Sequence, residues 1–504
     1  MDASCGGRRD LEIGSVIKFA EWTPDQPAFE SAGATEAKNV IPAVRGYRCL
    51  KDVAPVSGAA TNNILGMFAG KDDDGNAALY AGDSGKLYKF NAADSSLTDK
   101  SKGGGYSTAG DNVWRFVQFG ETLLATNFDD PIQTTTVASA GAFADASGTP
   151  PRAKFIAAVR DQVMTGFTHD GTDGVKPYRL RWSAINDATS WTVGTGLADF
   201  QDIVDLGDCT GLVGGEYAIG LFEKGIVRGN FVGAPLIYQF DKIHTSRGCA
   251  VPGSVAAIGP EQVFFLSDDG FYMLRGSELV PIGAEKVNNY FFKRLKTANR
   301  ENMRAAVDPL QQIVIWAFPS VDSADGSNDE LIIYNYFLNR WSRAVVACDA
   351  LAPLFTAGYT LEQLDNISSS IDALPASLDD GVFMGGTFFF AAAKDKKVQS
   401  FTGTCLSATI DTGEFQVTAG RRSLVNTVIP YVEGGSVAPT ISASIGSRAL
   451  QHEDVTFGSA STVNSEGFCP VRAEGRFHRV RVNIVNDWTQ AQGIDVDAQA
   501  TGLR

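Results

Sequence analysis

Short hydrophobic runs separated by polar turns dominate the chain. A typical pair is AALYAG at 77–82 and GKLYKF at 85–90, with Asp83 and Ser84 between them. Such runs, rich in aliphatic and aromatic residues and bounded by Gly, Asp or Asn, are typical of β-strands, and two of them around a short polar turn predict a β-hairpin. Few segments have the 3.6-residue period of a helix. The pattern therefore predicts an all-β protein.

The same hairpin pattern recurs along the chain. Further pairs of runs surround Glu121, occupy 217–233 and 263–274, and follow at 313–319 and 330–345. Their spacing of roughly 40 to 50 residues, between about 50 and 405, matches the blade period of a β-propeller better than the denser spacing of a sandwich. The length of this region accommodates six or seven blades.

Two segments share a local pattern that suits strands of an early and a late blade. GKLYKFN at 85–91 and KKVQSFTG at 396–403 each have a basic residue, an apolar residue directly after it and a Phe three positions further on. The repeat is otherwise structural, because no longer stretch of sequence is duplicated.

Two segments interrupt the β pattern. Apolar residues at helical spacing predict a helix between about Ala284 and Thr297. The residues that carry this period are Val287, Tyr290, Phe291 and Leu295. A second segment, at about 357–380, is expected to be an insertion that protrudes from a blade, with a short helix followed by a Ser-rich loop.

Changes in the pattern of hydrophobic and polar residues divide the chain into three parts. Residues 1–50 form an N-terminal segment, 51–405 the propeller, and 406–504 a small C-terminal β domain with strands such as 425–432 and 476–485. A chain of 504 residues exceeds the size at which one hydrophobic core stops growing, so more than one structural unit is expected.

Charge restricts the possible partners. The 43 basic and 58 acidic residues give a formal net charge of −15, which disfavours general binding to nucleic-acid phosphates or anionic membranes. It does not exclude DNA that passes close by, because a conduit with repulsive walls lets a polyanion slide without holding it.

Cysteine usage and the apolar runs suggest where the chain folds. Seven scattered cysteines with no C-x-x-C pair predict neither a disulfide framework nor a zinc site, and assembly in a reducing cytoplasm fits best. The first residues lack the apolar region of a signal peptide, and no run approaches the roughly 18 apolar residues of a membrane span. We therefore expect a soluble, unprocessed chain without a membrane span.

Two motifs of hydrolases fail on their missing partners. Gly82 to Gly85 spells the sequence around a chymotrypsin-like nucleophile, but the base of such proteases precedes that serine and no histidine occurs before His169. His452 and Glu453 begin a zinc-protease pattern, but Thr456 stands where the second histidine is needed. The first motif is interpreted as a hairpin turn, and the second cannot form a metal site.

Two loops imitate ligand-binding motifs without their spacing. In KDDDGN, at 71–76, the Gly comes too early for a calcium loop and Asp83 occupies the place of the bidentate Glu. SKGGGYS, at 101–107, matches neither phosphate-binding glycine pattern. The four histidines, none at ligand spacing, are His169, His244, His452 and His478. No catalytic, cofactor-binding or metal-binding residue is therefore assigned, no cofactor is expected, and the chain is not predicted to be an enzyme.

One partial motif keeps an enzymatic alternative open. Ser183, Asp187, Ser190 and Trp191 loosely resemble the Asp-box turn of sialidase propellers, although the sequence AT replaces the Gly after the Asp. A true Asp box stabilises blade turns and performs no catalysis. Glycoside cleavage generally needs two carboxylates about 5 to 9.5 Å apart, a spacing that sequence does not establish. A glycan-cleaving phage propeller is the leading enzymatic alternative.

Long stretches of the chain resemble the tail nozzle proteins of short-tailed bacteriophages, also called packaged-DNA stabilisation proteins. The resemblance is nearly continuous over 198–259 and 263–292, and no catalytic signature is part of it. The other matching segments are 114–133, 150–167, 179–191 and the C-terminal 475–498.

The resemblance implies a structural virion protein. Members of this family form a six-fold ring below the portal and its adaptor, close the channel after packaging and open it for ejection. The expected protein partners are further copies in a hexamer, the adaptor or head–tail connector protein, and other tail proteins (fibres, spikes or needle). Residues 1–50 are a candidate segment for docking to these other tail proteins. Genomic DNA is expected to pass through without sequence-specific binding. The expected location is the phage tail, assembled in the host cytoplasm.

A third interpretation is a receptor-binding propeller at the tip or periphery of the tail. It predicts an exposed face rich in Trp and Tyr. The seven tryptophans are spread along the chain, which favours blade cores over one sugar-stacking face.

Overall fold

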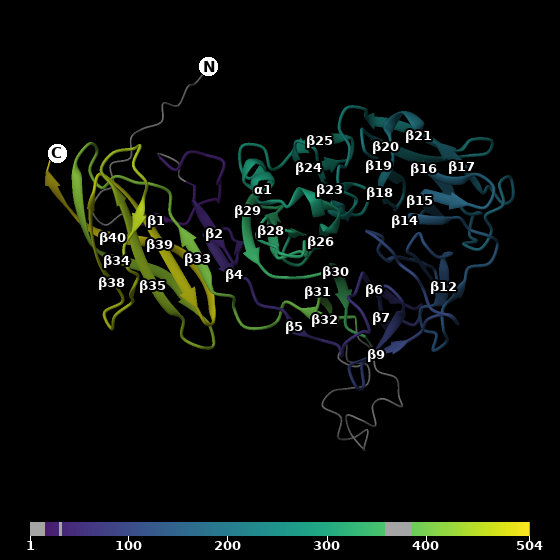
Figure 1. Cartoon of the computed structure of the whole chain (residues 1–504), viewed down its shortest axis with the longest axis horizontal. Helices are drawn as coiled ribbons and strands as arrows, with labels where there is room; N and C mark the ends of the chain where they lie inside the picture. The colour runs from purple at the N-terminus through teal and green to yellow at the C-terminus, as the bar shows by residue number, and fades with distance from the viewer. Residues whose placement is uncertain (1–15, 30–32, 358–385, 503–504) are drawn as a thin grey trace.

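The chain forms a seven-bladed β-propeller beside a unit of two β-sheets (Figure 1). The computed structural model describes residues 16–29, 33–357 and 386–502. The insertion predicted at about 357–380 therefore falls, from residue 358 onward, outside the described residues. The all-β propeller predicted from the sequence is confirmed, and seven is one of the two blade counts that the length accommodates.

Six blades are antiparallel sheets of four consecutive strands. Blade 1 contains β6 (Gly66–Lys71), β7 (Ala77–Gly82), β8 (Leu87–Asn91) and β9 (Ser96–Asp99). Blade 2 contains β10 (Arg115–Phe119), β11 (Thr122–Thr126), β12 (Gln133–Thr136) and β13 (Ala144–Asp145). Blade 3 contains β14 (Arg152–Val159), β15 (Gln162–Asp170), β16 (Gly174–Trp182) and β17 (Asp199–Asp202). Blade 4 contains β18 (Cys209–Val213), β19 (Ala218–Phe222), β20 (Ile226–Gly233) and β21 (Ile237–His244). Blade 5 contains β22 (Ala256–Ile258), β23 (Gln262–Ser267), β24 (Gly270–Arg275) and β25 (Glu278–Pro281). Blade 6 contains β26 (Arg304–Asp308), β27 (Ile313–Phe318), β28 (Glu330–Asn335) and β29 (Arg340–Val345).

The seventh blade closes the ring with a strand from the other end of the propeller sequence. It contains β30 (Ala350–Phe355), β31 (Phe388–Lys394), β32 (Lys397–Ser400) and, as its outermost strand, β5 (Ala54–Pro55). Gln399 pairs with Pro55 and Ser400 with Ala54. Because β5 precedes blade 1 in the chain, this pairing ties the first and last blades together and leaves no open seam between them.

Two further sheets pack against each other to form a sandwich at the side of the propeller (Figure 1). The first sheet runs β3 (Val40–Pro42), β4 (Tyr47–Cys49), β40 (Trp488–Gly502), β34 (Arg422–Gly434) and β38 (Cys469–Gly475), with β1 (Ile17–Lys18) on β40. The second runs β2 (Glu36–Lys38), β33 (Ala408–Asp411), β39 (Phe477–Val485), β35 (Thr440–Arg448) and β36 (Thr456–Phe457), with β37 (Ser461–Thr462) on β35. Val428 from the first sheet and Ile445 and Val482 from the second belong to one buried core.

The sandwich takes strands from both ends of the chain. β1, β3 and β4 join the sheet of β40, and β2 pairs with β33 on one side and, in parallel, with β29 of blade 6 on the other. Residues 1–50 and 406–504 are expected from the sequence to be separate parts, whereas the strand pairing places residues 17–49 and 408–502 in the same two sheets. β2 also makes the second sheet continuous with blade 6.

Helical structure is scarce, as the sequence predicted. The helix expected between about Ala284 and Thr297 is present as α1 (Asn288–Arg294), followed by the 3-10 helix η3 (Thr297–Asn302). The other short turns are η1 (Val204–Leu206) and η2 (Pro252–Ser254). In the part of the chain that the structure describes, the longest helix has seven residues, so none is long enough to cross a membrane.

The tryptophans fill cores between sheets. All seven tryptophans are buried, with exposed fractions of 3% or less, as their spread along the sequence predicted. Trp316 and Trp341 of blade 6 stack with ring centroids 5.8 Å apart, and both pack on Phe271 of blade 5. Aromatic contacts between neighbouring sheets thus hold adjacent blades together.

One expectation about cysteine is wrong. Cys49 and Cys405 form a disulfide across 356 positions of sequence. The cysteines are odd in number and scattered along the sequence, so the pair could not be recognised from sequence. Its two members approach each other only because the folded propeller brings β4 and the segment after β32 together. The other described cysteines, Cys209, Cys249, Cys348 and Cys469, are free and buried.

Candidate functional site

The GDSG motif forms a hairpin turn around the buried carboxylate of Asp83. Asp83 is fully buried, and its carboxylate accepts hydrogen bonds from the backbone N–H groups of Asn62, Gly85 and Lys86 and from the hydroxyl of Tyr88. A carboxylate with this many donors stabilises the hairpin between β7 and β8. The sequence interpretation of this motif as a turn is confirmed.

The other imitations of ligand sites are also local turns. Asp72 accepts a hydrogen bond from the backbone N–H of Asn76, which closes the hairpin between β6 and β7. Glu453 accepts hydrogen bonds from the backbone N–H groups of Ala449 and Leu450, and His452 beside it is exposed. Among the described residues, no group of three or more His, Cys, Asp or Glu side chains could hold a metal ion.

The segment that resembles an Asp box has a structural role. Asp187 accepts hydrogen bonds from the backbone N–H and hydroxyl of Thr189, at 2.8 and 2.6 Å. Trp191 is 1% exposed and donates to the carbonyl of Ala188. Ser183 is fully buried and its hydroxyl accepts from the N–H of Val163. The segment thus holds the connection between β16 and β17 against blade 3.

His478 is buried in the sandwich between two serine hydroxyls. Its Nε2 lies 2.8 Å from the Ser423 hydroxyl and its Nδ1 lies 2.7 Å from the Ser447 hydroxyl. Burial lowers the pKa of His478 to about 4, so the ring is neutral at physiological pH. The ring is fully buried, so this Ser–His–Ser arrangement links β34, β39 and β35 and is closed to a substrate.

The centre of the propeller holds a cavity of about 540 Å³. It is lined by the innermost strands of blades 1 to 4 and by residues of blade 5. The lining residues are Phe68, Arg115, Phe116, Val117, Phe155, Ile156, Ala157, Ala158, Gly211, Leu212, Val213, Gly214, Val255 and Ala257. Volumes of this order suit small organic ligands. The only charged side chain in this lining is Arg115.

Arg115 lies inside the cavity on the face of an aromatic ring. Its guanidinium carbon is 4.6 Å from the centroid of the Phe155 ring, a cation–π distance. Burial, together with a smaller repulsion from Arg304, lowers the pKa of Arg115 to about 10. The group therefore remains protonated at neutral pH.

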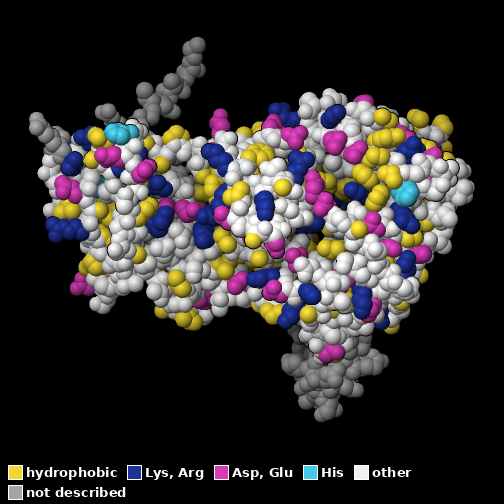
Figure 2. All heavy atoms as spheres, viewed as in Figure 1, with side chains coloured by type: hydrophobic (Ala, Val, Ile, Leu, Met, Phe, Trp, Pro, Cys, Tyr) yellow, Lys and Arg dark blue, Asp and Glu magenta, His cyan; other side chains and the backbone are white. Residues whose placement is uncertain are grey.

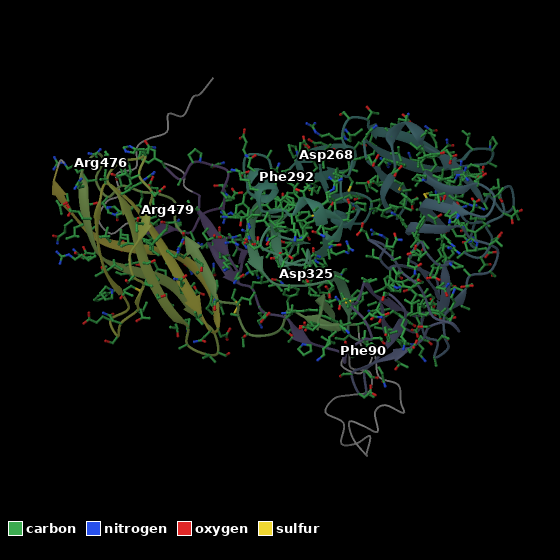
Figure 3. All side chains as sticks on the ribbon, viewed as in Figure 1. Phe90, Asp268, Phe292, Asp325, Arg476 and Arg479 are labelled. Atoms are coloured by element: carbon green, nitrogen blue, oxygen red, sulfur yellow. A yellow bond between two sulfur atoms is a disulfide. The ribbon has the colours of Figure 1, made fainter. Side chains whose placement is uncertain are left out.

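A second arginine and a carboxylate lie at the beginning of the innermost strands of blades 6 and 7. Arg304 begins β26 and donates to the carbonyls of Glu301 and Met303. Asp349 precedes β30, and burial together with repulsion from Asp395 raises its pKa to about 6. Asp325, labelled in Figure 3, adds to this repulsion. Sequence analysis assigned no role to these residues, because a single Arg or Asp at a strand end carries no motif.

Ion pairs fasten the sandwich to blade 6. Arg343 of β29 makes a bidentate pair with Glu36 of β2, with both N···O distances 2.8 Å. Lys286 pairs with Glu21 at 2.7 Å, and the carboxylate of Asp25 accepts hydrogen bonds from the first N–H groups of α1. The N-terminal residues therefore connect the two units by charge as well as by strand pairing.

Three exposed apolar residues lie in turns near the junction of these units. Val44, Leu310 and Phe337 have exposed fractions of 73, 72 and 71%. The three turns that carry them are neighbours. The side chain of Arg340 donates a hydrogen bond to the carbonyl of Ala43, and the backbone N–H of Tyr336 donates to the carbonyl of Gln312. We call Val44, Leu310 and Phe337 the turn patch. Contiguous exposed apolar surface of sufficient size is typical of contacts with another protein, so the turn patch is a candidate contact surface.

Charge is dispersed over the face of the molecule shown in Figure 2. Basic and acidic side chains alternate across both units, with apolar side chains between them. The net charge of −15 is therefore not concentrated in one acidic patch on this face.

Comparison with known proteins yields a likeness of fold alone. No protein-family model and no curated protein matches the chain. Solved structures that match include the extracellular domain of the hybrid two component system BT4673 from B. thetaiotaomicron, at 8% identity and a TM-score of 0.39 over 81% of this chain and 47% of that one. The same domain, described as a one component system, matches at 9% identity and a TM-score of 0.40, over 88 and 62%. The Pan2 WD40 domain of Neurospora crassa matches at 7% identity and 0.37, over 70 and 96%. This chain thus spans about half the length of the first of these structures.

Proposed function

We propose that the chain is a structural subunit of a bacteriophage tail, one of six in the nozzle ring that extends the portal and adaptor channel. The ring retains packaged DNA and lets it pass during ejection. It contacts the adaptor and other tail proteins and has no enzymatic step. The virion is its location, reached by assembly in the host cytoplasm.

The sequence resemblance over 198–259 and 263–292 carries this proposal. These segments correspond to blade 4, blade 5 and the beginning of α1, with their connecting turns. The resemblance therefore covers whole blades and the helix that packs beside them, and not one short strand pattern that unrelated propellers share. The C-terminal match at 475–498 covers β39 and most of β40. The N-terminal strands β1 and β4 pair with β40, and β39 pairs with β33, the strand that holds β2.

The architecture suits a rigid subunit of a ring. A closed propeller leaves few free sheet edges, and rigid blades position their loops accurately against a neighbour. The sandwich is joined to blade 6 by the pairing of β2 with β29 and by the Glu36–Arg343 ion pair. The turn patch gives the ring a contact surface that a second copy would bury.

The charge is compatible with DNA in transit. Six times −15 gives the ring about −90 in formal charge. Acidic side chains that face a lumen repel the DNA backbone, which reduces friction while basic loops or a plug protein hold the end. Charge reversal of lumen-facing acids is expected to slow ejection, and an unchanged rate contradicts the sliding function.

The first experiment is to count copies of this protein in purified virions by quantitative mass spectrometry, normalised to the twelve-fold portal. About six copies support the nozzle ring. A count in multiples of three that is not six favours the glycan-cleaving or receptor-binding alternatives, which occur as trimeric fibres or spikes. Absence from the virion overturns the structural proposal.

A second experiment tests the turn patch in the same particles. Phe337→Asp places a charge on the patch without touching a core, because that side chain is 71% exposed. We expect particles carrying this variant to lose the ring and leak DNA. The matched control is Val437→Asp, at 59% exposed on the sandwich, which should assemble normally. Normal rings with Phe337→Asp exclude the patch from the subunit contact.

A further inference from the structure

The interior of the propeller holds a positive charge that no carboxylate neutralises. Arg115 lines the central cavity, and among the described residues its guanidinium has neither an ion-pair partner nor a hydrogen-bond acceptor. Its contact is the Phe155 ring, which offers quadrupole attraction but no negative charge. Enclosed charges in proteins are normally paired. Arg115 is partly enclosed, and water in the open cavity reaches its guanidinium in place of a protein partner.

Other enclosed arginines of this protein follow that rule. Arg448 makes a bidentate pair with Glu414, at 2.6 Å for both contacts, and Arg343 makes the same arrangement with Glu36. The chain has 58 acidic residues, so carboxylates are plentiful. Among the described residues, Arg115 has no such pair, and neither has Arg304, whose acceptors are backbone carbonyls. The unpaired donors of Arg115 suit an acceptor that comes from outside the chain.

A second arginine increases the positive field at the cavity. Arg304 lies close enough to Arg115 to repel it, and its Nε is buried without a hydrogen-bond partner among the described residues. An anion placed at Arg115 is attracted by both guanidinium groups.

The remainder of the lining selects the body of the ligand. Apart from Arg115 its side chains are apolar, including the three phenylalanines Phe68, Phe116 and Phe155, while backbone groups supply polar surface between them. A lining of this kind with one positioned charge is typical of sites for small molecules that combine an apolar part with a single ionised group. Inorganic phosphate lacks the apolar part, and a neutral hydrocarbon leaves the arginine unpaired.

We propose that the central cavity is a binding site for a small organic carboxylate with an aromatic or branched aliphatic body. The carboxylate accepts hydrogen bonds from the Arg115 guanidinium in bidentate geometry, and the body packs on Phe68 and Phe116. The site lies in the propeller axis and is independent of the nozzle function, so either proposal stands if the other fails.

The test is calorimetric titration of the full chain with 4-phenylbutyrate, and with 4-phenylbutanamide as its neutral counterpart. We expect saturable binding of the carboxylate at one site and at least tenfold weaker binding of the amide. Arg115→Met, which keeps an apolar stem of similar length, should weaken carboxylate binding at least tenfold. The matched control is Arg247→Met, because Arg247 also stacks on an aromatic ring, Tyr272, but is exposed and paired with Asp269.

A second variant keeps the test decisive if Arg115→Met does not fold. Ala257→Phe places a ring in the cavity and leaves the arginine intact, so it should abolish binding while the melting temperature stays near that of the parent. Equal affinity for the acid and the amide, unchanged affinity in Arg115→Met, binding that survives Ala257→Phe, or no binding of 4-phenylbutyrate each overturn the proposal.

Discussion

Cys49 and Cys405 are bonded to each other at the point where the chain enters and leaves the propeller. Cys49 ends β4, and Cys405 follows the last propeller strand, β32. The backbone bridge between Lys51 and Cys405 lies beside the bond. Together with the pairing of β5 and β32, the bond makes the propeller a covalently closed circle of chain.

Removal of this bond is expected to destabilise the whole molecule. The double substitution Cys49→Ser with Cys405→Ser should lower the free energy of unfolding by about 2–4 kcal/mol, because the cross-link restricts the unfolded chain over a long loop. Urea titration of oxidised parent and variant measures the difference. Dithiothreitol should lower the stability of the parent and leave the variant unchanged. Equal stability of the oxidised parent and the double variant contradicts the prediction that the disulfide between Cys49 and Cys405 stabilises the fold.

The fold could be predicted largely because each blade consists of hairpins formed by residues close together in the sequence. The hairpin patterns that begin at Ala77 and at Val263 need only a few neighbouring residues to be recognised. Even the weak similarity of 85–91 to 396–403 marks equivalent strands, since β8 and β32 are each third in their blade. Local patterns do not report the partners of short strands far away, so the pairing of β2 with both β29 and β33 could not be predicted.

The candidate site could not be predicted, for a related reason. Arg115 and Phe155 are 40 positions apart and meet only because their strands are innermost in neighbouring blades. Each residue alone is ordinary for a strand. Spacing alone did allow the GDSG segment to be interpreted as a hairpin turn, and Asp83 forms that turn.

The ion pair between Glu36 and Arg343 should contribute to stability in a measurable way. Both side chains are mostly enclosed, with exposed fractions of 23 and 16%. We expect Glu36→Gln to lower the free energy of unfolding by about 2 kcal/mol, since it leaves an arginine poorly paired in a protected site. A double-mutant cycle with Arg343→Met should give a coupling energy of about 1–2 kcal/mol.

The matched pair for that cycle is Lys86 and Asp99. Their side chains are 42 and 44% exposed at a similar distance, 3.0 Å, so solvent screens the attraction. Their coupling energy should be about 0.5 kcal/mol or less. Equal coupling in the two cycles contradicts the view that enclosure of Glu36 and Arg343 strengthens the link between sandwich and propeller.

The buried His478 should make the sandwich sensitive to acid. Its pKa of about 4 in the folded state lies below the ordinary value near 6.5, so the unfolded chain binds the extra proton first. Stability is complete above about pH 6.5 and declines as the pH falls toward 4, by up to about 3 kcal/mol. Melting temperatures measured between pH 7.5 and 4.5 should show this decline.

The variant His478→Gln removes the titrating ring, so its stability should be lower at pH 7 but depend less on pH over the same range. His452→Gln provides the control, because His452 is exposed and its replacement should leave the profile of the parent unchanged. If His478→Gln follows the same pH profile as the parent, another group causes the acid sensitivity.

Asp349 should have the opposite effect on the pH profile. Burial and repulsion from Asp395 raise its pKa to about 6, above the ordinary value near 3.9, so the folded state holds this proton more tightly than the unfolded chain. Its charge therefore costs stability increasingly as the pH rises from about 4 to 6, and the full cost persists above that window. Asp349→Asn is expected to raise the free energy of unfolding at pH 7.5 by roughly 1 kcal/mol and to leave it unchanged at pH 4.

Comparison of variant and parent at each pH isolates this effect from that of His478, because both proteins share the histidine. Asp74→Asn is the matched control, since Asp74 is an exposed acid in the turn between β6 and β7 and its loss should change stability little at either pH. Asp395→Asn should produce part of the gain by removing the repulsion while the desolvation of Asp349 remains. A destabilised Asp349→Asn at pH 7.5 means instead that the attraction between Asp349 and Arg304 outweighs burial, and that this carboxylate helps to hold the arginine beside the central cavity.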